Sequence, residues 1–207
     1  EVNRRKLAEL EARVNGKIAL GLGCDFHLSF DNIDDALKNP HKYSINQKNY
    51  LLVEFADLSI PQQMTQVFHE FLVSGIQPII THPERNLTIQ KTPTRLDEWI
   101  TGGCVVQVTA ASLTGRFGKV AMEFAHRLLR QNKVHILATD AHDLRSRPPK
   151  MKEAYDLVAN RYGAETAERL CVTNPGAAFR GDDFPPQPEA LSDEDSRKGF
   201  WSRLLRS

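Results

Sequence analysis

Four ionisable residues of the kinds that bind metals stand within or directly after short apolar runs of the sequence: Asp25, Glu54, His82 and Asp140. Apolar runs of this length that alternate with helical segments predict the strands of a parallel sheet. The carboxyl ends of parallel strands share one face of a sheet or barrel, where the active sites of such folds are built. Carboxylates and imidazoles that converge there form the ligand set of a divalent-metal site.

The segment Asp140-Ala141-His142 adds another histidine to this set. In strand geometry, side chains two residues apart point to the same side, so one rigid element would supply two ligands. Simpler explanations exist for single members of the set: an acidic residue that caps a helix or lies in a turn, or a histidine at the surface. Glu54 is the most specific member, since a carboxylate inside an apolar strand is costly unless it is paired or metal-bound.

Arg85 and Arg147 lie a few residues past the two histidines, on loops expected at the same face. A guanidinium binds phosphate oxygens through two parallel hydrogen bonds, so each arginine is a candidate phosphate ligand. The alternative is that both are solvated surface arginines. His27, two residues beyond Asp25, is a candidate for lining the same pocket.

The composition fits an ordinary globular chain of 207 residues, 41% of them hydrophobic and 26% charged. The 27 basic and 26 acidic residues leave a net charge of +1, which argues against a nucleic-acid partner. The three cysteines are odd in number and widely spaced, which indicates free thiols in a reducing compartment. No apolar run reaches the roughly 20 residues that span a bilayer, so we expect a cytoplasmic protein.

The order of elements predicts an α/β fold, with helices between the strands of a parallel sheet or barrel. Five strands are fewer than the seven or eight, roughly, of a closed barrel, so either the sheet is open or strands precede Glu1. We expect strands at 17–24, 50–55, 77–81, 104–109 and 134–139, and helices at 1–14, 61–74, 94–101, 116–131 and 148–171, with a short one from Asn174-Pro175.

The sequence divides into two parts. Residues 1–181 carry the alternating pattern and form the expected catalytic domain. Residues 182–207 contain a proline cluster, an acidic run and a basic, aromatic end, Phe200–Arg206, and predict a flexible tail outside the core. Any membrane contact is expected through this tail alone.

Several motifs together resemble one family. The motifs are Leu51–Phe55, Ile79–Asn86, Val106–Leu113, Ala138–Leu144 and Arg147–Met151. In order and spacing they resemble the bacterial tyrosine-protein phosphatases of the PHP (polymerase and histidinol phosphatase) superfamily, of the capsule and exopolysaccharide-biosynthesis type. The resemblance runs from about residue 1 to about residue 180.

The resemblance implies a distorted (β/α)7 barrel with a cluster of manganese ions, with iron, magnesium or zinc as alternatives. It implies that Asp25, Glu54, His82, Asp140 and His142 are metal ligands and that Arg85 and Arg147 lie in the substrate pocket. The implied substrate is phosphotyrosine on the C-terminal tail of a membrane-associated tyrosine autokinase. The family's opening His-x-His strand has no counterpart in this chain, so we expect the N-terminal barrel strands to be missing from it.

Two other functions stay open at this point. One is a PHP-type small-molecule phosphatase, similar to a histidinol-phosphate phosphatase, with the same metals and a differently shaped pocket. The other is a non-catalytic barrel remnant that acts as a binding module. The sequence leaves the oligomeric state open.

Overall fold

The computed structural model describes residues 2–27, 30–39, 41–56, 60–192 and 194–196. Within them, one parallel sheet has the strand order β1-β2-β3-β4-β5, so each strand pairs with the next in sequence. The strands are β1 (Asp25–His27), β2 (Tyr50–Glu54), β3 (Gln77–Thr81), β4 (Val105–Thr109) and β5 (Ile136–Ala138). The α/β class predicted from the sequence is therefore confirmed.

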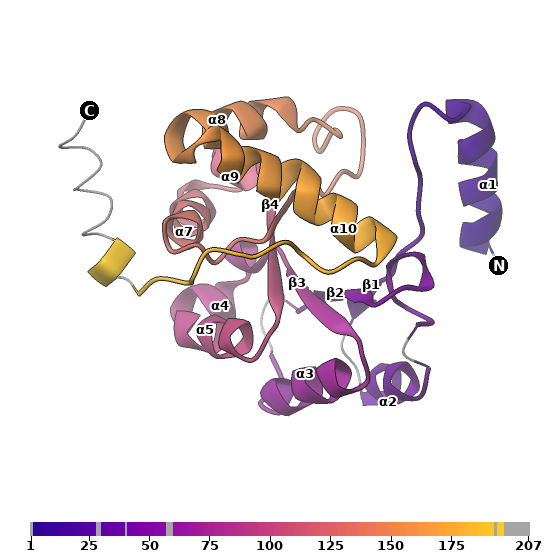
Figure 1. The fold of residues 1–207 in the computed structure, drawn as a ribbon, viewed down its shortest axis with the longest axis horizontal. Coiled ribbons are helices and arrows are strands. Elements are labelled where there is room, and N and C mark those ends of the chain that lie inside the picture. Colours follow the sequence, from indigo (N-terminus) through magenta and orange to yellow (C-terminus); the bar gives the residue numbers. More distant parts are fainter. Residues whose placement is uncertain (1, 28–29, 40, 57–59, 193, 197–207) are drawn as a thin grey trace.

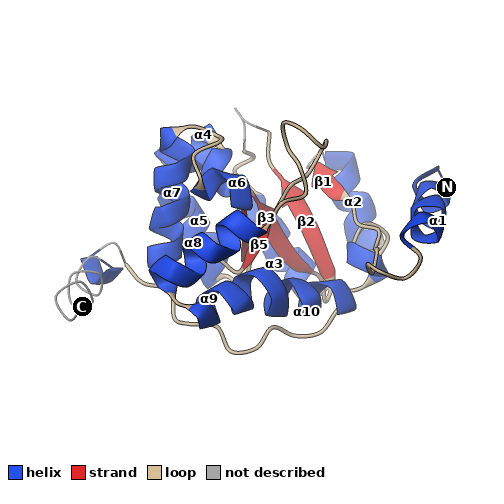
Figure 2. Ribbon diagram, turned by 90° about the horizontal axis from the view of Figure 1, so that it is seen from above, coloured by secondary structure: helices blue, strands red, loops and turns tan. Residues whose placement is uncertain are grey.

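Helices connect and cover the strands (Figures 1 and 2). The α-helices are α1 (Val2–Val14), α2 (Phe30–Lys38), α3 (Met64–Val73), α4 (Leu87–Lys91), α5 (Pro93–Thr101), α6 (Ala110–Leu113), α7 (Lys119–Arg130), α8 (Lys152–Tyr162), α9 (Ala164–Glu168) and α10 (Asn174–Arg180). Short helices of other types are η1 (Ile45–Gln47), η2 (Pro83–Arg85) and η3 (Arg169–Thr173). None of the described helices is long and apolar enough to cross a membrane.

The sheet buries both of its faces, as expected of a parallel sheet. Side chains that alternate along β3 separate the two cores: Ile80 joins the larger apolar cluster and Ile79 the smaller one. The larger cluster receives Phe68 of α3, Trp99 of α5 and other apolar residues of the helices. The smaller cluster receives Ala178 of α10. Both faces of the sheet are therefore covered, and Glu54 and His82 lie at the carboxyl ends of β2 and β3.

The first predicted strand, 17–24, is wrong, and the strand begins only at Asp25. The backbone before it bonds to a loop instead: Leu22 N–H donates to the Asn46 side chain at 3.0 Å, and Asn46 N–H donates to the Leu22 carbonyl at 2.7 Å. Gly21 permits this contact, because a Cβ there would lie 2.4 Å from the Asn46 Oδ1.

The single helix predicted at 148–171 is also wrong. Helix begins at Lys152, and Gly163, at φ 101°, separates α8 from α9. A positive φ of this size favours glycine and interrupts the helical path.

The segment 182–192 differs from the expected free tail, because it packs on the smaller core (Figure 1). The Phe184 ring stacks on Tyr50, with centroids 5.1 Å apart and planes 13° from parallel. The Gln187 side-chain oxygen accepts hydrogen bonds from Arg169 at 2.8 Å and from Asn174 at 2.9 Å. The predicted basic and aromatic end, Phe200–Arg206, lies outside the described residues.

Candidate metal and phosphate site

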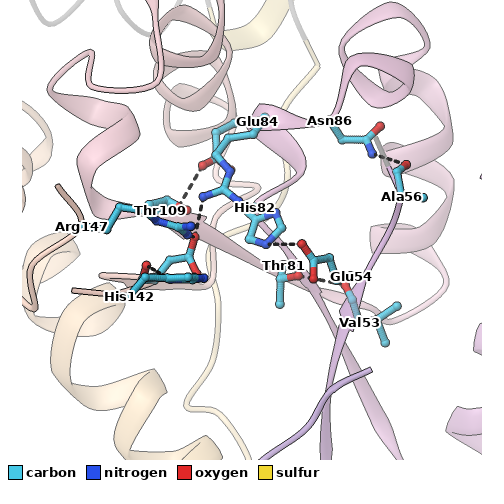
Figure 3. Close-up of polar contacts among 12 residues, drawn as sticks. Val53, Glu54, Ala56, Thr81, His82, Glu84, Asn86, Thr109, His142 and Arg147 are labelled. Carbon is cyan, nitrogen blue, oxygen red and sulfur yellow. Dashed lines mark hydrogen bonds and ion pairs between the residues drawn. The ribbon is translucent and has the colours of Figure 1, made fainter. Parts of the chain in front are cut away.

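Three of the five predicted ligands converge on neighbouring strands, and two of them, Glu54 and His82, lie at the carboxyl ends of their strands. Asp25 begins β1, Glu54 ends β2 and His82 follows β3. One ligand atom from each residue lies within 4.8 Å of those of the other two. The side chains of Glu54 and His82 point toward each other, with Glu54 Oε1 3.3 Å from His82 Nε2 (Figure 3). Two carboxylates and one imidazole at this spacing suit a divalent metal ion.

His82 is held in place by its backbone. The residue has the left-handed φ of 36°, and its N–H donates to the Gln107 carbonyl at 2.8 Å, which ties the end of β3 to β4. Burial lowers the pKa of His82, and the nearby Arg85 charge lowers it further. The lowered pKa favours the neutral imidazole, which is the form that binds a metal.

Asp140 lies outside this three-residue cluster and faces the two predicted phosphate ligands. Arg85 Nη1 is 2.5 Å from Asp140 Oδ2, and Arg147 Nη2 donates to the same oxygen. The Phe117 ring contacts both guanidiniums, with its centroid 4.6 Å from the Arg85 Cζ and 5.7 Å from the Arg147 Cζ. The structure therefore brings Arg85 and Arg147 to a common anion, here a carboxylate.

The two halves of the site are neighbours. The charges of Asp140 and Asp25 both raise the pKa of His82, against the larger lowering effects of burial and Arg85. An anion held by the arginines would therefore lie near the cluster of Asp25, Glu54 and His82.

His142 occupies the rim of the site. Its side chain is 58% exposed, and its Nδ1 is 2.9 Å from the Asp140 carbonyl oxygen. Strand geometry does not extend to this pair, because β5 ends at Ala138 and Asp140 has a left-handed φ of 50°. The expectation that both side chains project from one strand is therefore wrong, and a ligand role for His142 stays a prediction. His27 lies in β1, but its side chain is outside the described part.

Glu84 is a residue of the site region that the sequence reasoning missed. Its side chain is fully buried, and Oε1 accepts hydrogen bonds from Thr109 N at 3.0 Å and Ser112 Oγ at 2.6 Å. No described residue bonds to Oε2, and burial raises the pKa of this carboxyl. Glu84 thus ties the loop that carries His82 and Arg85 to the end of β4. The only sequence signal is an acid three positions after a buried strand, which does not separate a buried anchor from an exposed turn residue.

Asn86 anchors the other side of the same loop. Its Oδ1 caps α4 by accepting from Thr88 N and Ile89 N, both at 3.0 Å. Its Nδ2 donates to the Ala56 carbonyl at 3.1 Å, just beyond β2 (Figure 3). The loop between His82 and Asn86 is therefore fixed to both neighbouring strands.

The sequence matches known proteins over most of its length. A family model described as capsular polysaccharide synthesis, CpsB/CapC, matches residues 1–180. Tyrosine-protein phosphatase YwqE of Bacillus subtilis is 32% identical over 162 residues, 77% of this chain and 63% of that protein. Tyrosine-protein phosphatase CpsB of Streptococcus pneumoniae is 30% identical over 178 residues, 84% of this chain and 73% of that protein.

A Staphylococcus aureus relative named CapC is 38% identical over 126 residues, but these are only 49% of its length. The chain thus spans about half to three quarters of the relatives it matches. The fold agrees with a solved structure from work on YwqE and CpsB, described as unique metal-dependent tyrosine phosphatases. The TM-score is 0.83 at 27% identity, over 91% of this chain and 77% of that one. The chain belongs to the CpsB/CapC family of capsular polysaccharide synthesis.

Proposed function

We propose that this protein is a metal-dependent protein-tyrosine phosphatase that acts in capsule or exopolysaccharide regulation. The observation that carries the proposal is the placement of a carboxylate and imidazole cluster next to two arginines that bind one anion. Hydrolysis of a phosphomonoester needs both an activated water and cations that stabilise the charge of the transition state. The names of the relatives, tyrosine-protein phosphatases, support the same reaction.

The metal is proposed to be manganese, with iron, magnesium or zinc as alternatives, held by Asp25, Glu54 and His82. Asp140 and His142 are proposed as two further ligands. A mixed set of carboxylates and imidazoles fits a divalent ion, and the lowered pKa of the buried His82 favours the neutral imidazole that coordinates one. A bound metal would lower the pKa of a water toward neutrality and so supply the nucleophile.

The substrate is proposed to be a phosphotyrosine protein, with its phosphate bound by Arg85 and Arg147. Both guanidiniums already reach one carboxylate oxygen, and a phosphate offers the same charge-assisted hydrogen bonds. Phe117, which contacts both guanidiniums, keeps their planes in place. The cognate protein is proposed to be the C-terminal tail of a membrane-associated tyrosine autokinase, reached from the cytoplasm.

We also propose that residues 1–181 belong to a PHP-type (β/α)7 barrel whose first strands precede Glu1. The strand order supports this, because parallel strands paired strictly in sequence order are typical of barrels, whereas doubly wound sheets reverse their order at a switch point. The longer relatives support it as well, since the matched structure has chain beyond the part that this protein covers.

The test compares substrates. The manganese-loaded protein, as residues 1–207 and as the complete gene product, is assayed on phosphotyrosine, phosphoserine and histidinol-phosphate substrates. We expect hydrolysis of the phosphotyrosine peptide, abolished by a chelator and by His82→Ala, and retained in His69→Ala on the exposed face of α3. Faster hydrolysis of the small phosphomonoester would favour the small-molecule phosphatase, and no hydrolysis by either form would favour the binding module.

A further inference from the structure

A small cavity of about 90 Å³ lies beside the arginine pair. Its walls come from three places: the start of α6, the loop that carries Arg116 and Phe117, and the segment from Thr139 to the start of α8. Arg147 lines this cavity and also binds Asp140, so the cavity adjoins the proposed phosphate site.

The charge of the cavity is mainly positive. Arg116, Arg147 and Lys150 line it, against one acidic residue, Glu153. The chain as a whole has a net charge of only +1, so three cations around one small cavity are a local concentration. A carboxylate placed there would meet cations that are close to one another.

Two of these cations carry no carboxylate partner in the described part of the chain. Arg147 shares the Asp140 carboxylate with Arg85, whereas the hydrogen bond that Arg116 makes among the described residues is to the carbonyl oxygen of Ser146, at 3.3 Å. Lys150 makes no ion pair with any described residue, although Lys152, two positions on, pairs with Asp156 at 2.6 Å. Both Arg116 and Lys150 are exposed, so their charged ends are available to a bound molecule.

We propose that Arg116 and Lys150 form a subsite for an acidic side chain of the substrate, next to the phosphotyrosine. The inference rests on the proposed phosphatase function, because it is Arg147 that joins the cavity to the phosphate site. Because Arg147 lines the cavity, a phosphate bound by Arg85 and Arg147 would lie next to it, and residues of an extended peptide, about 3.3–3.6 Å apart along the chain, can reach it from positions close to the phosphotyrosine. We expect this subsite to make the protein prefer peptides that carry aspartate or glutamate beside the phosphotyrosine.

The experiment uses two phosphotyrosine peptides that differ only at the flanking positions, which are aspartate in one and asparagine in the other. The value of kcat/KM is measured for the manganese-loaded protein at low ionic strength. Dissociation constants are measured in parallel by fluorescence anisotropy, with a non-hydrolysable phosphonate in place of the phosphate. The variants are Arg116→Gln/Lys150→Gln and, as the matched control, Lys152→Gln, which removes a neighbouring exposed lysine that lies outside the cavity lining.

We expect the unmodified protein to favour the aspartate peptide about three- to tenfold in kcat/KM and in affinity, as two exposed ion pairs allow. The preference should fall to about one in the double variant, stay in Lys152→Gln, and weaken as salt screens the charges. Equal values for both peptides in the unmodified protein would overturn the subsite. An equal loss for both peptides in the double variant would overturn it too, because the two cations would then act on the phosphate itself. Absence of hydrolysis with a retained affinity preference would overturn the phosphatase proposal and leave the subsite standing.

Discussion

Arg85 and Asp140 stand 55 positions apart in the sequence and form an ion pair of 2.5 Å at the carboxyl face of the sheet. The pair joins the loop after β3 to the segment after β5, and Arg147 binds the same carboxylate oxygen. Two guanidiniums on one carboxylate leave one positive charge uncompensated within the group. An incoming phosphate is therefore attracted to this point even while Asp140 occupies it.

Replacement of Arg85 tests its role toward phosphate. We expect Arg85→Ala to lower kcat/KM for a phosphotyrosine peptide by about a hundredfold, the usual effect of losing one charge-stabilising donor. Arg85→Lys should recover only part of this loss, since an ammonium keeps the charge but not the two-pronged geometry. Steady-state kinetics with metal analysis check the prediction. Unchanged kinetics in both variants would show that Arg85 only neutralises Asp140.

Replacement of Glu84 tests the anchor beneath the site. Glu84→Ala leaves the buried donors of Thr109 and Ser112 without an acceptor, so we expect the free energy of unfolding to fall by about 2–4 kcal/mol. Glu84→Gln keeps an acceptor oxygen, so it should lower the free energy of unfolding by less than Glu84→Ala does. Urea denaturation measures both, with Glu123→Ala on the exposed face of α7 as the control. A loss in Glu84→Ala no larger than in the control would contradict the anchoring role.

The pH dependence of stability should report on His135. Burial is the main cause that lowers its pKa to about 4, and its Nδ1 accepts a hydrogen bond from Val106 N at 3.1 Å. The unfolded chain has the ordinary pKa of 6.5 and binds the proton more tightly than the folded one. The neutral His135 therefore contributes up to about 3 kcal/mol to the free energy of unfolding. This contribution is fully present above pH 6.5 and is lost as the pH falls toward 4.

Urea denaturation between pH 4 and pH 7.5 checks this expectation for the unmodified protein and for His135→Gln. The difference in unfolding free energy between the two should shrink as the pH falls. A difference that stays constant across this range would contradict the assignment. His69→Gln, at an exposed position on α3, serves as the control.

The segment 182–192 should contribute to stability rather than act as a free tail. We expect Phe184→Ala to lower the unfolding free energy by about 2 kcal/mol, because it removes the ring that stacks on Tyr50. Glu189→Ala, in the same segment but exposed, should change it by less than about 0.5 kcal/mol. Thermal unfolding checks both variants. A loss in Phe184→Ala as small as that in Glu189→Ala would show that the segment is a free tail.

The sequence predicted the parts of this molecule that depend on periodicity. Apolar runs gave four of the strands, and their order brought Glu54 and His82 together, because parallel strands must align their carboxyl ends. The apolar run before Asp25 has the composition of a strand, but its composition does not reveal that the Leu22 N–H donates to the Asn46 side chain instead of to a neighbouring strand.

The remaining differences between the predicted and the observed structure depend on tertiary contacts. The left-handed turn at Asp140 directs that side chain to Arg85 rather than along the strand, and neither the turn nor the pair 55 positions apart is a local property of the sequence. Phe184 looked like part of a proline-rich tail because its stacking partner, Tyr50, lies far away in the sequence. The buried state of Glu84 likewise follows from donors on β4 and α6.

The metal cluster is tested most directly by titration of the metal-free protein with manganese, followed by calorimetry and by hydrolysis of a phosphotyrosine peptide. Asp25, Glu54 and His82 are predicted to bind the ion together, so His82→Ala should weaken manganese binding by at least about tenfold and abolish hydrolysis in parallel. His69→Ala should bind and hydrolyse as the unmodified protein does. Tight manganese binding and full hydrolysis in His82→Ala would contradict a catalytic metal at this site.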